Sequence, residues 1–572
     1  MAFNFYHYPH TDLNQANFEW IIQQIKALQS GSGETAANIY YIGSIDDLDT
    51  FAAGSSKGLL VVNDGSTHAV SAGTVFNSSL SILFISGMLS GTFEIQGAIL
   101  APRQQIFASG STVTINGSKT PVGYPEWFGA AANSSSVDST SAIQTCINAF
   151  PITELAAGDY YVAGGLLISA SNRILRGQGA VSYNGSTWQG GTRLISSAGV
   201  DAITIADPSE AFAVTTITVQ DLSILPLIAD YTAAGRGIRV HCMRNLHLER
   251  ITIQDYTTGI AIGSIMDGWI RECRYLNRKA QGSAAVTTGI NILQELPYAS
   301  SNSSISSLWI LDSEINYINT GTNTTTGYGI RSEAGTTGLA DLYIHNNNFV
   351  GVPYAVRLIG SGSGNAIQQN IFLRDNTIDN CISAVEISGN LKAYVLNNWI
   401  SCGAYAAGST HRGIYLHDNV TSGVTVACNT IKNADSSTAT AYGIRCAEIS
   451  GVTGHDNTII NFPYPVFVGT GSGSSLYGYD LGVHAINNKQ QYSGSTNNIM
   501  RVADCHHGRF TASSSGQYGY NTGIYFSSNS YSCVGDASGV DLNTTSPKAA
   551  VAGTAFTAPF VSDTNNNVAI YA

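Results

Sequence analysis

Two short strand phrases alternate along the middle of this 572-residue chain, and they restrict its fold more than any other feature. One reads Gly-Ile-x-aliphatic, as at 237–240 (GIRV) and 289–292 (GINI). The other ends in Asp/Asn-Asn-x-Ile, as at 375–378 (DNTI), and its closing apolar position recurs at steps from 22 (378 to 400) to 40 (275 to 315). Short strands at such steps, with no long helices between them, predict a parallel β-helix. A β-propeller is the competing fold, but each of its blades would need about 40 residues and four strands.

A column of asparagines accompanies the second phrase. Because asparagine tolerates left-handed backbone and can bond its neighbour one coil along, the column predicts a ladder of turns. Its members are Asn347, Asn376, Asn398, Asn429 and Asn457.

Composition narrows the classes of function. Lys and Arg number 26 against 38 Asp and Glu, a net charge of -12, which argues against a nucleic-acid partner. Hydrophobic residues make up 44%, so the chain is not of the disordered class. No apolar run of about 18 residues predicts membrane insertion, and the first ten residues do not read as a secretory signal. The nine cysteines form no CxxC pair, so we expect buried free thiols, no metal and no cofactor.

Four regions follow one another along the chain. Residues 1–33 contain an aromatic arm and a helix, 34–122 a small β-rich neck, and 123–477 the β-helix with a capping helix at its start. Residues 478–572 are a C-terminal β region, where 523–526 (GIYF) repeats the strand phrase. The short N-terminal helix cannot stay folded alone, so its apolar face packs on its own chain or docks on a partner or another copy, and the aromatic arm before it and the linker after it favour docking. That face carries Phe18, Ile21, Ile22 and Ile25.

Several short motifs lie at and before the start of the predicted β-helix. Residues 124–130 (YPEWFGA) and 138–144 (DSTSAIQ), with 175–179 (LRGQG), resemble the opening and the first coil of the pectate-lyase-like β-helix in bacteriophage tailspikes. Residues 101–107 (APRQQIF) look like the phrase that precedes it. Residues 5–14 (FYHYPHTDLN) resemble the virion-attachment start of tail appendages in short-tailed phages.

The resemblance implies an all-β, right-handed and homotrimeric β-helix that is made in the host cytoplasm and carried on the virion tail. Its N-terminus would attach to a tail or neck adaptor protein, and its β-helix would bind, with or without depolymerising, a host surface polysaccharide. The calcium and lysine motifs of pectate lyases do not stand out, so pectin cleavage is not implied. A stand-alone polysaccharide hydrolase or lyase and a non-catalytic structural or adhesin β-helix remain alternatives.

One outward row of the predicted β-helix concentrates charge. In the Gly-Ile-x phrase the residue x points outward. A parallel outward row lies two residues after x and includes Glu333 and His417. Glu333 and Glu386 lie two coils apart, about 10 Å along the axis. That is near the 6.5–9.5 Å of an inverting glycosidase acid and base. Arginines suit anionic groups of a polymer, whereas Tyr415 and His417 suit orienting a sugar. The arginines of this row are Arg331, Arg357 and Arg445. Alternating charges also keep a solvated sheet face from sticking to itself, which is the commoner meaning of such a row.

A second outward row is aromatic. It lies four residues before the asparagine column and is followed at every step by an inward aliphatic residue. Such an apolar stripe predicts an interface, and we favour trimer contact over a glycan platform. Its members are Trp269, Trp309, Tyr343, Phe372 and Tyr394. Asp312 and Asp375 lie beside it and form a rival catalytic pair in a groove between subunits.

Overall fold

The computed structural model describes residues 38–468 with gaps, and after them only the backbone of five strands. The chain forms two compact units, Met1–Ile195 and Ser196–Ala572. No helix in the described part of the chain is long and apolar enough to cross a membrane. The gaps are 55–56, 181, 184–187, 210, 228–234, 278–285, 293–304, 318–326, 333–338, 361–367, 390, 404–409, 418–422, 435–440, 447–451, 456, 461 and 463.

The first unit contains two small parallel sheets, of strand order β1-β2-β4-β6 and β3-β5-β7. Phe76, Phe84 and Phe107 are fully buried in its core. The predicted capping helix is α3, and the Asp138 carboxylate accepts a hydrogen bond from the amide of Thr140 at its start. The elements are β1 (Asn38–Tyr41), η2 (Ile42–Ser44), α2 (Leu48–Ala53), β2 (Gly58–Val62), β3 (Thr67–Phe76), β4 (Leu80–Phe84), β5 (Met88–Ile95), β6 (Ile99–Leu100), β7 (Thr112–Ile115), β8 (Val122–Gly123), η3 (Pro125–Phe128), β9 (Ser134–Asp138), α3 (Thr140–Ala149), β10 (Ile152–Glu154), β11 (Gly158–Val162), β12 (Leu166–Ile168), β13 (Arg173–Arg176), β14 (Ser182–Tyr183), β15 (Trp188–Gln189) and, at the boundary, β16 (Thr192–Ser196).

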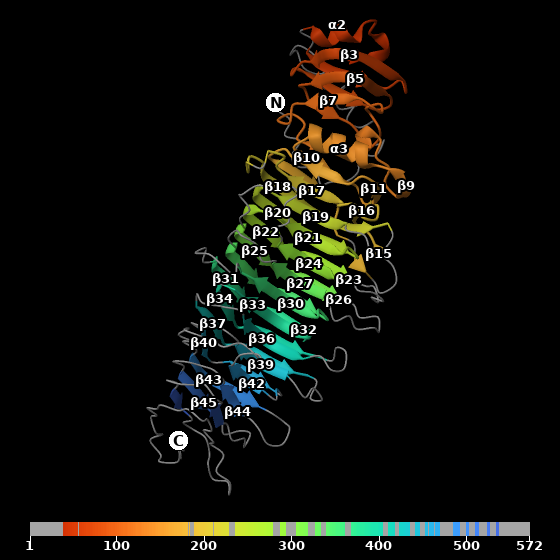
Figure 1. Cartoon of the computed structure of the whole chain (residues 1–572). Helices are drawn as coiled ribbons and strands as arrows, with labels where there is room; N and C mark the ends of the chain where they lie inside the picture. Colours follow the sequence, from red (N-terminus) through yellow and green to blue (C-terminus); the bar gives the residue numbers. More distant parts are fainter. Residues whose placement is uncertain are drawn as a thin grey trace, which may run out of the picture. The chain divides into compact units, whose positions relative to one another are not determined.

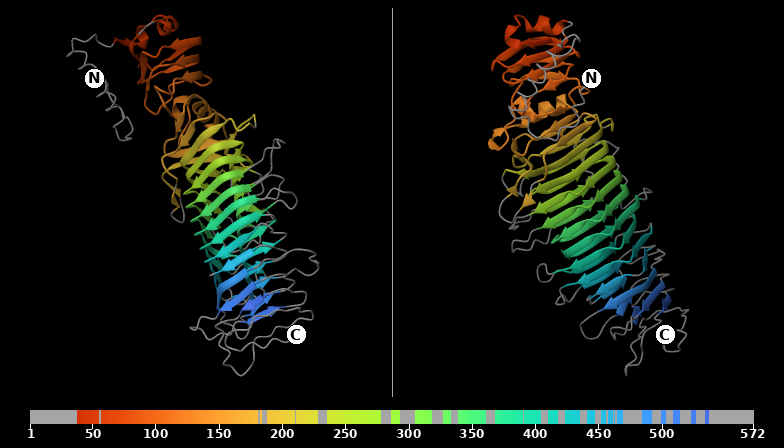
Figure 2. Two further views of the ribbon diagram at one scale, coloured as in Figure 1. Left: turned by 90° about the vertical axis from the view of Figure 1, so that its left-hand side faces the viewer. Right: turned by 180° about the vertical axis from the view of Figure 1, so that it is seen from behind.

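The second unit is a right-handed parallel β-helix, which confirms the fold predicted from the repeat. Most coils contribute one strand to each of three faces, and Figure 1 shows the third face as a stack of strands. The first face, seen in the left view of Figure 2, comprises β18 (Thr215–Pro226), β20 (Met243–Gln254), β22 (Ile265–Arg271), β25 (Ile305–Leu311), β28 (Leu339–His345), β31 (Gln368–Arg374), β34 (Leu391–Leu396), β37 (Val424–Ala427) and β40 (Val452–His455). The second face comprises β23 (Arg274–Asn277), β26 (Glu314–Tyr317), β29 (Asn348–Val350), β32 (Thr377–Cys381), β35 (Trp399–Cys402), β38 (Thr430–Asn433) and β41 (Thr458–Ile460). The third face comprises β17 (Ile203–Ala206), β19 (Arg236–His241), β21 (Thr258–Ile262), β24 (Thr287–Ile292), β27 (Gly327–Ser332), β30 (Tyr354–Ile359), β33 (Ser383–Ser388), β36 (His411–His417), β39 (Ala441–Cys446) and β42 (Tyr464–Val468).

Five further strands follow the three faces. The predicted phrase at 523–526 is strand β46, which pairs in parallel with β44. Their bounds are β43 (His484–Gln491), β44 (Ile499–Val502), β45 (Arg509–Ser513), β46 (Gly523–Phe526) and β47 (Val534–Asp536).

Parallel register stacks like residues inside the β-helix. On the first face Ile270 pairs with Ile310, which pairs with Ile344, and all three are fully buried. The glycine of the Gly-Ile-x phrase also faces inward. A Cβ on Gly329 would lie 2.4 Å from the Ala355 carbonyl oxygen and 2.8 Å from the Phe349 ring. Glycine is therefore required at position 329, where the backbone of the third face lies close to the Phe349 ring of the second face.

The asparagine column is a ladder of hydrogen bonds, as predicted. The Nδ2 of Asn398 donates to Asn429 Oδ1 (2.9 Å) and to the Leu373 carbonyl (3.1 Å), and its Oδ1 accepts from Asn376. The expectation that these asparagines adopt left-handed backbone is wrong. The residue before each of the first four takes that conformation instead, as at Asp375 (φ 58°) and Asn397 (φ 54°), which frees the asparagine side chain to point inward.

The expectation of buried free thiols holds for most described cysteines. Six of the seven are buried, and Cys428 is exposed because it occupies one of these left-handed corner positions (φ 58°).

Candidate functional site

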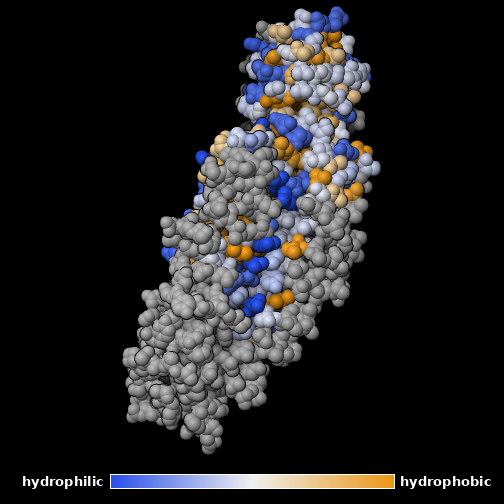
Figure 3. Space-filling model, in the orientation of Figure 1, coloured by the Kyte–Doolittle hydropathy of each residue, from blue (hydrophilic) through white to orange (hydrophobic). Residues whose placement is uncertain are grey.

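The charged row predicted on the third face is present. Register pairs Arg331 with Arg357, Arg357 with Glu386, Glu386 with Tyr415 and Tyr415 with Arg445, on five successive strands from β27 to β39. His417 lies at the end of β36 and reaches back to Glu386. Hydrophilic residues follow one another along the described part of this face in Figure 3.

Glu386 is the centre of this row. Only 7% of it is exposed, and its Oε1 lies 3.0 Å from Nε of Arg357 and 3.1 Å from Nε2 of His417. Burial alone would raise the pKa of Glu386. The hydrogen bond from His417 and the charge of Arg357 outweigh burial and hold that pKa below its ordinary value. Because an ionised carboxylate only accepts hydrogen bonds, the His417 Nε2 carries the proton between them.

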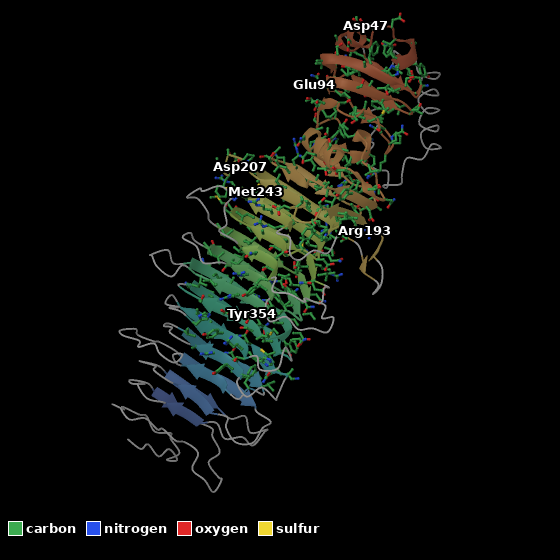
Figure 4. The ribbon with its side chains drawn as sticks, turned by 45° about the vertical axis from the view of Figure 1, so that its right-hand side comes forward. Asp47, Glu94, Arg193, Asp207, Met243 and Tyr354 are labelled. Atoms are coloured by element: carbon green, nitrogen blue, oxygen red, sulfur yellow. The ribbon has the colours of Figure 1, made fainter. Side chains whose placement is uncertain are left out.

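One arginine–tyrosine cluster lies on the N-terminal side of Glu386, and we call it the first clamp. Two guanidinium groups contact the Tyr328 ring: Arg331 Cζ lies 4.7 Å and Arg357 Cζ 5.6 Å from its centroid. Arg357 Nη1 also donates a 3.0 Å hydrogen bond to the Tyr328 hydroxyl. Tyr354, labelled in Figure 4, packs on the same ring at 5.2 Å.

A matching cluster, the second clamp, lies on the other side of Glu386. Tyr415 is contacted by Arg412 at 4.9 Å and by Arg445 at 5.0 Å, again measured from Cζ to the ring centroid. The Tyr415 ring stacks on His417 at 4.2 Å, and Arg445 also lies over Tyr442 at 4.8 Å. Both clamps therefore combine one central tyrosine with two arginines.

The third face is rich in positive charge. Among the described strands of this face, from β17 to β42, Glu386 is the only residue with a side-chain carboxylate. Its predicted catalytic partner, Glu333, lies outside the described residues. A general acid needs a raised pKa, so the lowered pKa of Glu386 suits a base or a fixed negative charge rather than the acid. That Glu333 acts as the partner of Glu386 in acid–base catalysis therefore stays a prediction.

The aromatic row on the first face is a continuous stack of rings. Trp309 and Tyr343 lie 3.7 Å apart between ring centroids and 7° from parallel, and Trp269 stacks on Trp309 at 5.6 Å and 14°. Phe372 and Tyr394 continue the stack at 5.1 and 4.8 Å. Ring faces that cover one another leave only their edges to the outside. A sugar packs on an open ring face, so this geometry favours the interface over the glycan platform predicted for Trp309 and Tyr343.

The rival carboxylates lie at the corner beside this stack. Asp375 accepts hydrogen bonds from His345 (2.8 Å), Arg374 (2.9 Å) and Asn397 (2.6 Å). Burial raises its pKa, and these bonds bring that pKa below the ordinary value. Asp312 accepts 2.7 Å from Asn346 and lies 3.8 Å from Arg271. Both carboxylates thus tie one coil to the next, a geometry that favours a structural part for the pair.

Four residues of the clamps and their surroundings were missed from the sequence. Tyr328, Tyr354, Arg412 and Tyr442 lie three residues before the x position, which simple alternation places on the inner side. In this phrase the glycine and the isoleucine both face inward, so the residue before the glycine faces out. The recurrence of Tyr and Arg before the glycine was the available signal.

The N-terminal docking helix lies outside the described residues. Phe18, Ile21, Ile22 and Ile25 therefore remain a prediction.

No protein-family model matches this sequence, and no curated protein matches it significantly. Solved structures to which the chain is similar include a double mutant of the tailspike protein of E. coli bacteriophage HK620 in complex with a pentasaccharide. That match has a TM-score of 0.49 and 13% identity, and covers 75% of this chain and 76% of that one. The Family 28 exopolygalacturonase of Yersinia enterocolitica matches with a TM-score of 0.38 and 12% identity, over 73% of this chain and 75% of that one. The A-module of a mannuronan C-5 epimerase from Azotobacter vinelandii matches with a TM-score of 0.37 and 15% identity, over 64% of this chain and 98% of that one.

Proposed function

We propose that this chain is a bacteriophage tail spike that binds a host surface polysaccharide on the third face of its β-helix. The observation that carries the proposal is the pair of arginine–tyrosine clamps on either side of Glu386. Parallel strands repeat about every 4.8 Å, so polar groups follow one another along the axis as the units of a polymer do. A globular ligand would not need so long a row.

The sequence motifs extend the proposal to assembly. The tailspike-like phrases at 124–130 and 175–179, with the arm at 5–14, support attachment to the virion through the N-terminus. The chain would be made in the host cytoplasm and incorporated into the tail through an adaptor protein. Three copies would associate along their β-helices through the stacked rings of the first face, since the edges of these rings are mostly apolar.

Cleavage of the bound polymer is a second candidate function. The observation in its favour is an ionised, nearly buried carboxylate hydrogen-bonded to a histidine in the middle of the face. A hydrolase or lyase would also need a proton donor, for which Glu333 is the sequence candidate. Without such a proton donor the third face would bind the polysaccharide without cleaving it.

One experiment tests binding, assembly and cleavage together. The purified protein is incubated with polysaccharide from candidate hosts and analysed by size-exclusion chromatography with light scattering. Co-elution of a three-chain species with polymer of unchanged length supports a receptor-binding spike. Shortened polymer whose formation stops in both Glu386→Gln and Glu333→Gln supports a depolymerase, whereas shortening that persists in both variants contradicts this site.

Two further outcomes would contradict the proposal. A single-chain mass would exclude the trimer. A protein that binds no surface polysaccharide from any host in the panel would exclude the proposed function. Deletion of residues 1–30 separates a virion protein from a stand-alone enzyme, because only a virion protein should then lose its incorporation into particles.

A further inference from the structure

The neck sheet β1-β2-β4-β6 is apolar on both of its sides. On one side Leu60, Val62 and Ile82 belong to the core of the first unit and are fully buried. The alternate positions form a second apolar cluster on the opposite side, which we call the outer neck face. It consists of Val61 and Leu83, which are 4% and 1% exposed, with Ile39, Leu59 and Ile85 packed against them.

The other sheet of the same unit, β3-β5-β7, has an ordinary polar outer side. Its inward Phe93 is buried, whereas Thr92 and its register partner Thr112 are exposed. In contrast, β2 (GLLVV) and β4 (LSILF) are almost continuously apolar, which is the pattern of parallel strands that are covered on both sides. The described members of the outer neck face all lie on β1 and β2 or on β4 and its end, so the layer that covers them comes from elsewhere.

We propose that this layer is the N-terminal segment of the same chain, and that the apolar face of the helix predicted within residues 18–28 packs on the outer neck face. The inference does not depend on what the third face of the β-helix binds. It assigns that helix face to the chain's own neck, and leaves the aromatic arm at 5–14 as the part that attaches to the adaptor protein.

The point at which the described chain begins favours this segment over other occupants. Asn38 opens β1, which is an edge strand of the same sheet. Residues 29–37 reach about 30 Å when extended, whereas β1 and β6 lie only about 14 Å apart at the usual strand spacing. The helix can therefore reach every strand of the sheet. A tethered segment also has an effective concentration on the order of millimolar, which a separate partner lacks.

The two surfaces also match in chemistry. The described outward positions of the four neck strands carry no charged side chain. The predicted helix has an apolar stripe with residues three or four apart, and such a short helix needs a surface to pack on. A helix laid on one side of a sheet is a common two-layer arrangement. The stripe consists of Phe18, Ile21, Ile22, Ile25 and Leu28.

The test places the photo-cross-linking residue p-benzoylphenylalanine at position 41 of the full chain. Tyr41 pairs with Val61 and is 44% exposed, so a larger aromatic ring fits at the rim of the face. Trypsin cleaves after Lys26 and Lys57, which separates the helix face from β1. After irradiation we expect a product with the mass of one chain on a denaturing gel, in which peptides 1–26 and 27–57 are joined. The same probe at Thr92, on the outer side of the other sheet, should give no link to peptide 1–26.

Two variants of the probe-bearing chain test the helix face itself. Ile22→Asp should lower the yield of the joined peptides about tenfold, since burying one isoleucine is worth at least that factor. The matched control is Gln23→Asp, which adds the same charge about 100° further around the helix and should leave the yield unchanged. Circular dichroism of each variant checks that the β-helix is still folded.

Four outcomes would overturn the inference. A product with the mass of two chains would show that a second copy covers the outer neck face. Absence of the joined peptides from the position 41 probe would leave that face to a separate partner. Equal yields from positions 41 and 92 would mean that the segment has no preferred place on the neck. An unchanged yield in Ile22→Asp would show that its apolar face makes no contact there.

Discussion

The first and third faces of the β-helix are built on the same coils but use their outward rows in opposite ways. On the first face residues of the same kind follow one another, and aromatic rings stack on each other from Trp269 to Tyr394. On the third face arginine and tyrosine alternate between neighbouring positions and coils, around one carboxylate. Both rows have the strand spacing of about 4.8 Å that suits flat groups in contact.

The difference shows that chemistry on a β-helix depends on the order of residues along its axis. A ring that stacks on a ring has both faces covered and offers a mostly apolar edge, which suits contact with another protein surface. A ring that meets a guanidinium combines a flat apolar surface with a positive charge, which suits a polar ligand. Neither property is visible in a single strand.

The largest expected effect comes from the asparagine ladder at the corner between the first and second faces. Asn398→Ala removes four side-chain hydrogen bonds from a residue that is 2% exposed, and leaves the Leu373 carbonyl and the Asn376 amide without their partner. We expect a loss of about 3 to 5 kcal/mol. It should appear as faster unfolding in urea together with loss of polymer binding. Asn348→Ala, on an exposed position of β29, is the matched control and should change little.

The next effect is confined to the third face. Arg357→Gln removes the ion pair of the nearly buried Glu386, whose carboxylate keeps its contact with His417, and we expect a loss of stability of about 2 to 3 kcal/mol. The double variant Arg357→Gln/Glu386→Gln, which lacks both charges, should recover part of the lost stability. A double-mutant cycle of unfolding rates measures this recovery. Arg274→Gln, an exposed pair on the second face, should cost about 0 to 1 kcal/mol. Equal costs for the two arginines would show that the Glu386 site is no more than a surface ion pair.

A smaller effect on stability, with a large one on assembly, is expected from the first face. Tyr343→Ala removes a ring stacked on both sides and should cost about 1 to 2 kcal/mol within one chain. Tyr343→Asp should in addition reduce the light-scattering mass from three chains to one while leaving binding to polymer in each chain. Trp399→Asp, at a position 41% exposed on the second face, is the control. If both variants stay trimeric, the stacked rings are not the interface.

The smallest effect is a dependence on pH. The folded-state pKa of Glu386 lies below its ordinary value of 4.5, so its contribution to stability is present above that value and is lost as pH falls through the folded pKa. The melting temperature of the wild type should therefore fall more steeply than that of Glu386→Gln below pH 4.5. Parallel curves would show that the His417 and Arg357 contacts do not stabilise the charged form.

Much of this architecture could be read from the sequence because a β-helix repeats. The inward Ile310 and Ile344, the asparagine ladder and the row from Arg331 to Arg445 all follow from period and register. The burial and lowered pKa of Glu386 could not be predicted, since both depend on side chains of the coils on either side. The clamps were half predicted: Arg445 was found, but Arg412 was missed because two successive inward residues break the alternation.

The stacked rings of the first face also form an optical reporter. The indoles of Trp269 and Trp309 lie 5.6 Å apart and nearly parallel, and Tyr343 lies 3.7 Å beyond them. Chromophores at such separations couple their electronic transitions, so folding of these three coils should produce a paired positive and negative band in the circular dichroism spectrum. That band would disappear in Trp309→Phe even if the fold is kept. Circular dichroism could therefore follow the folding of these neighbouring coils.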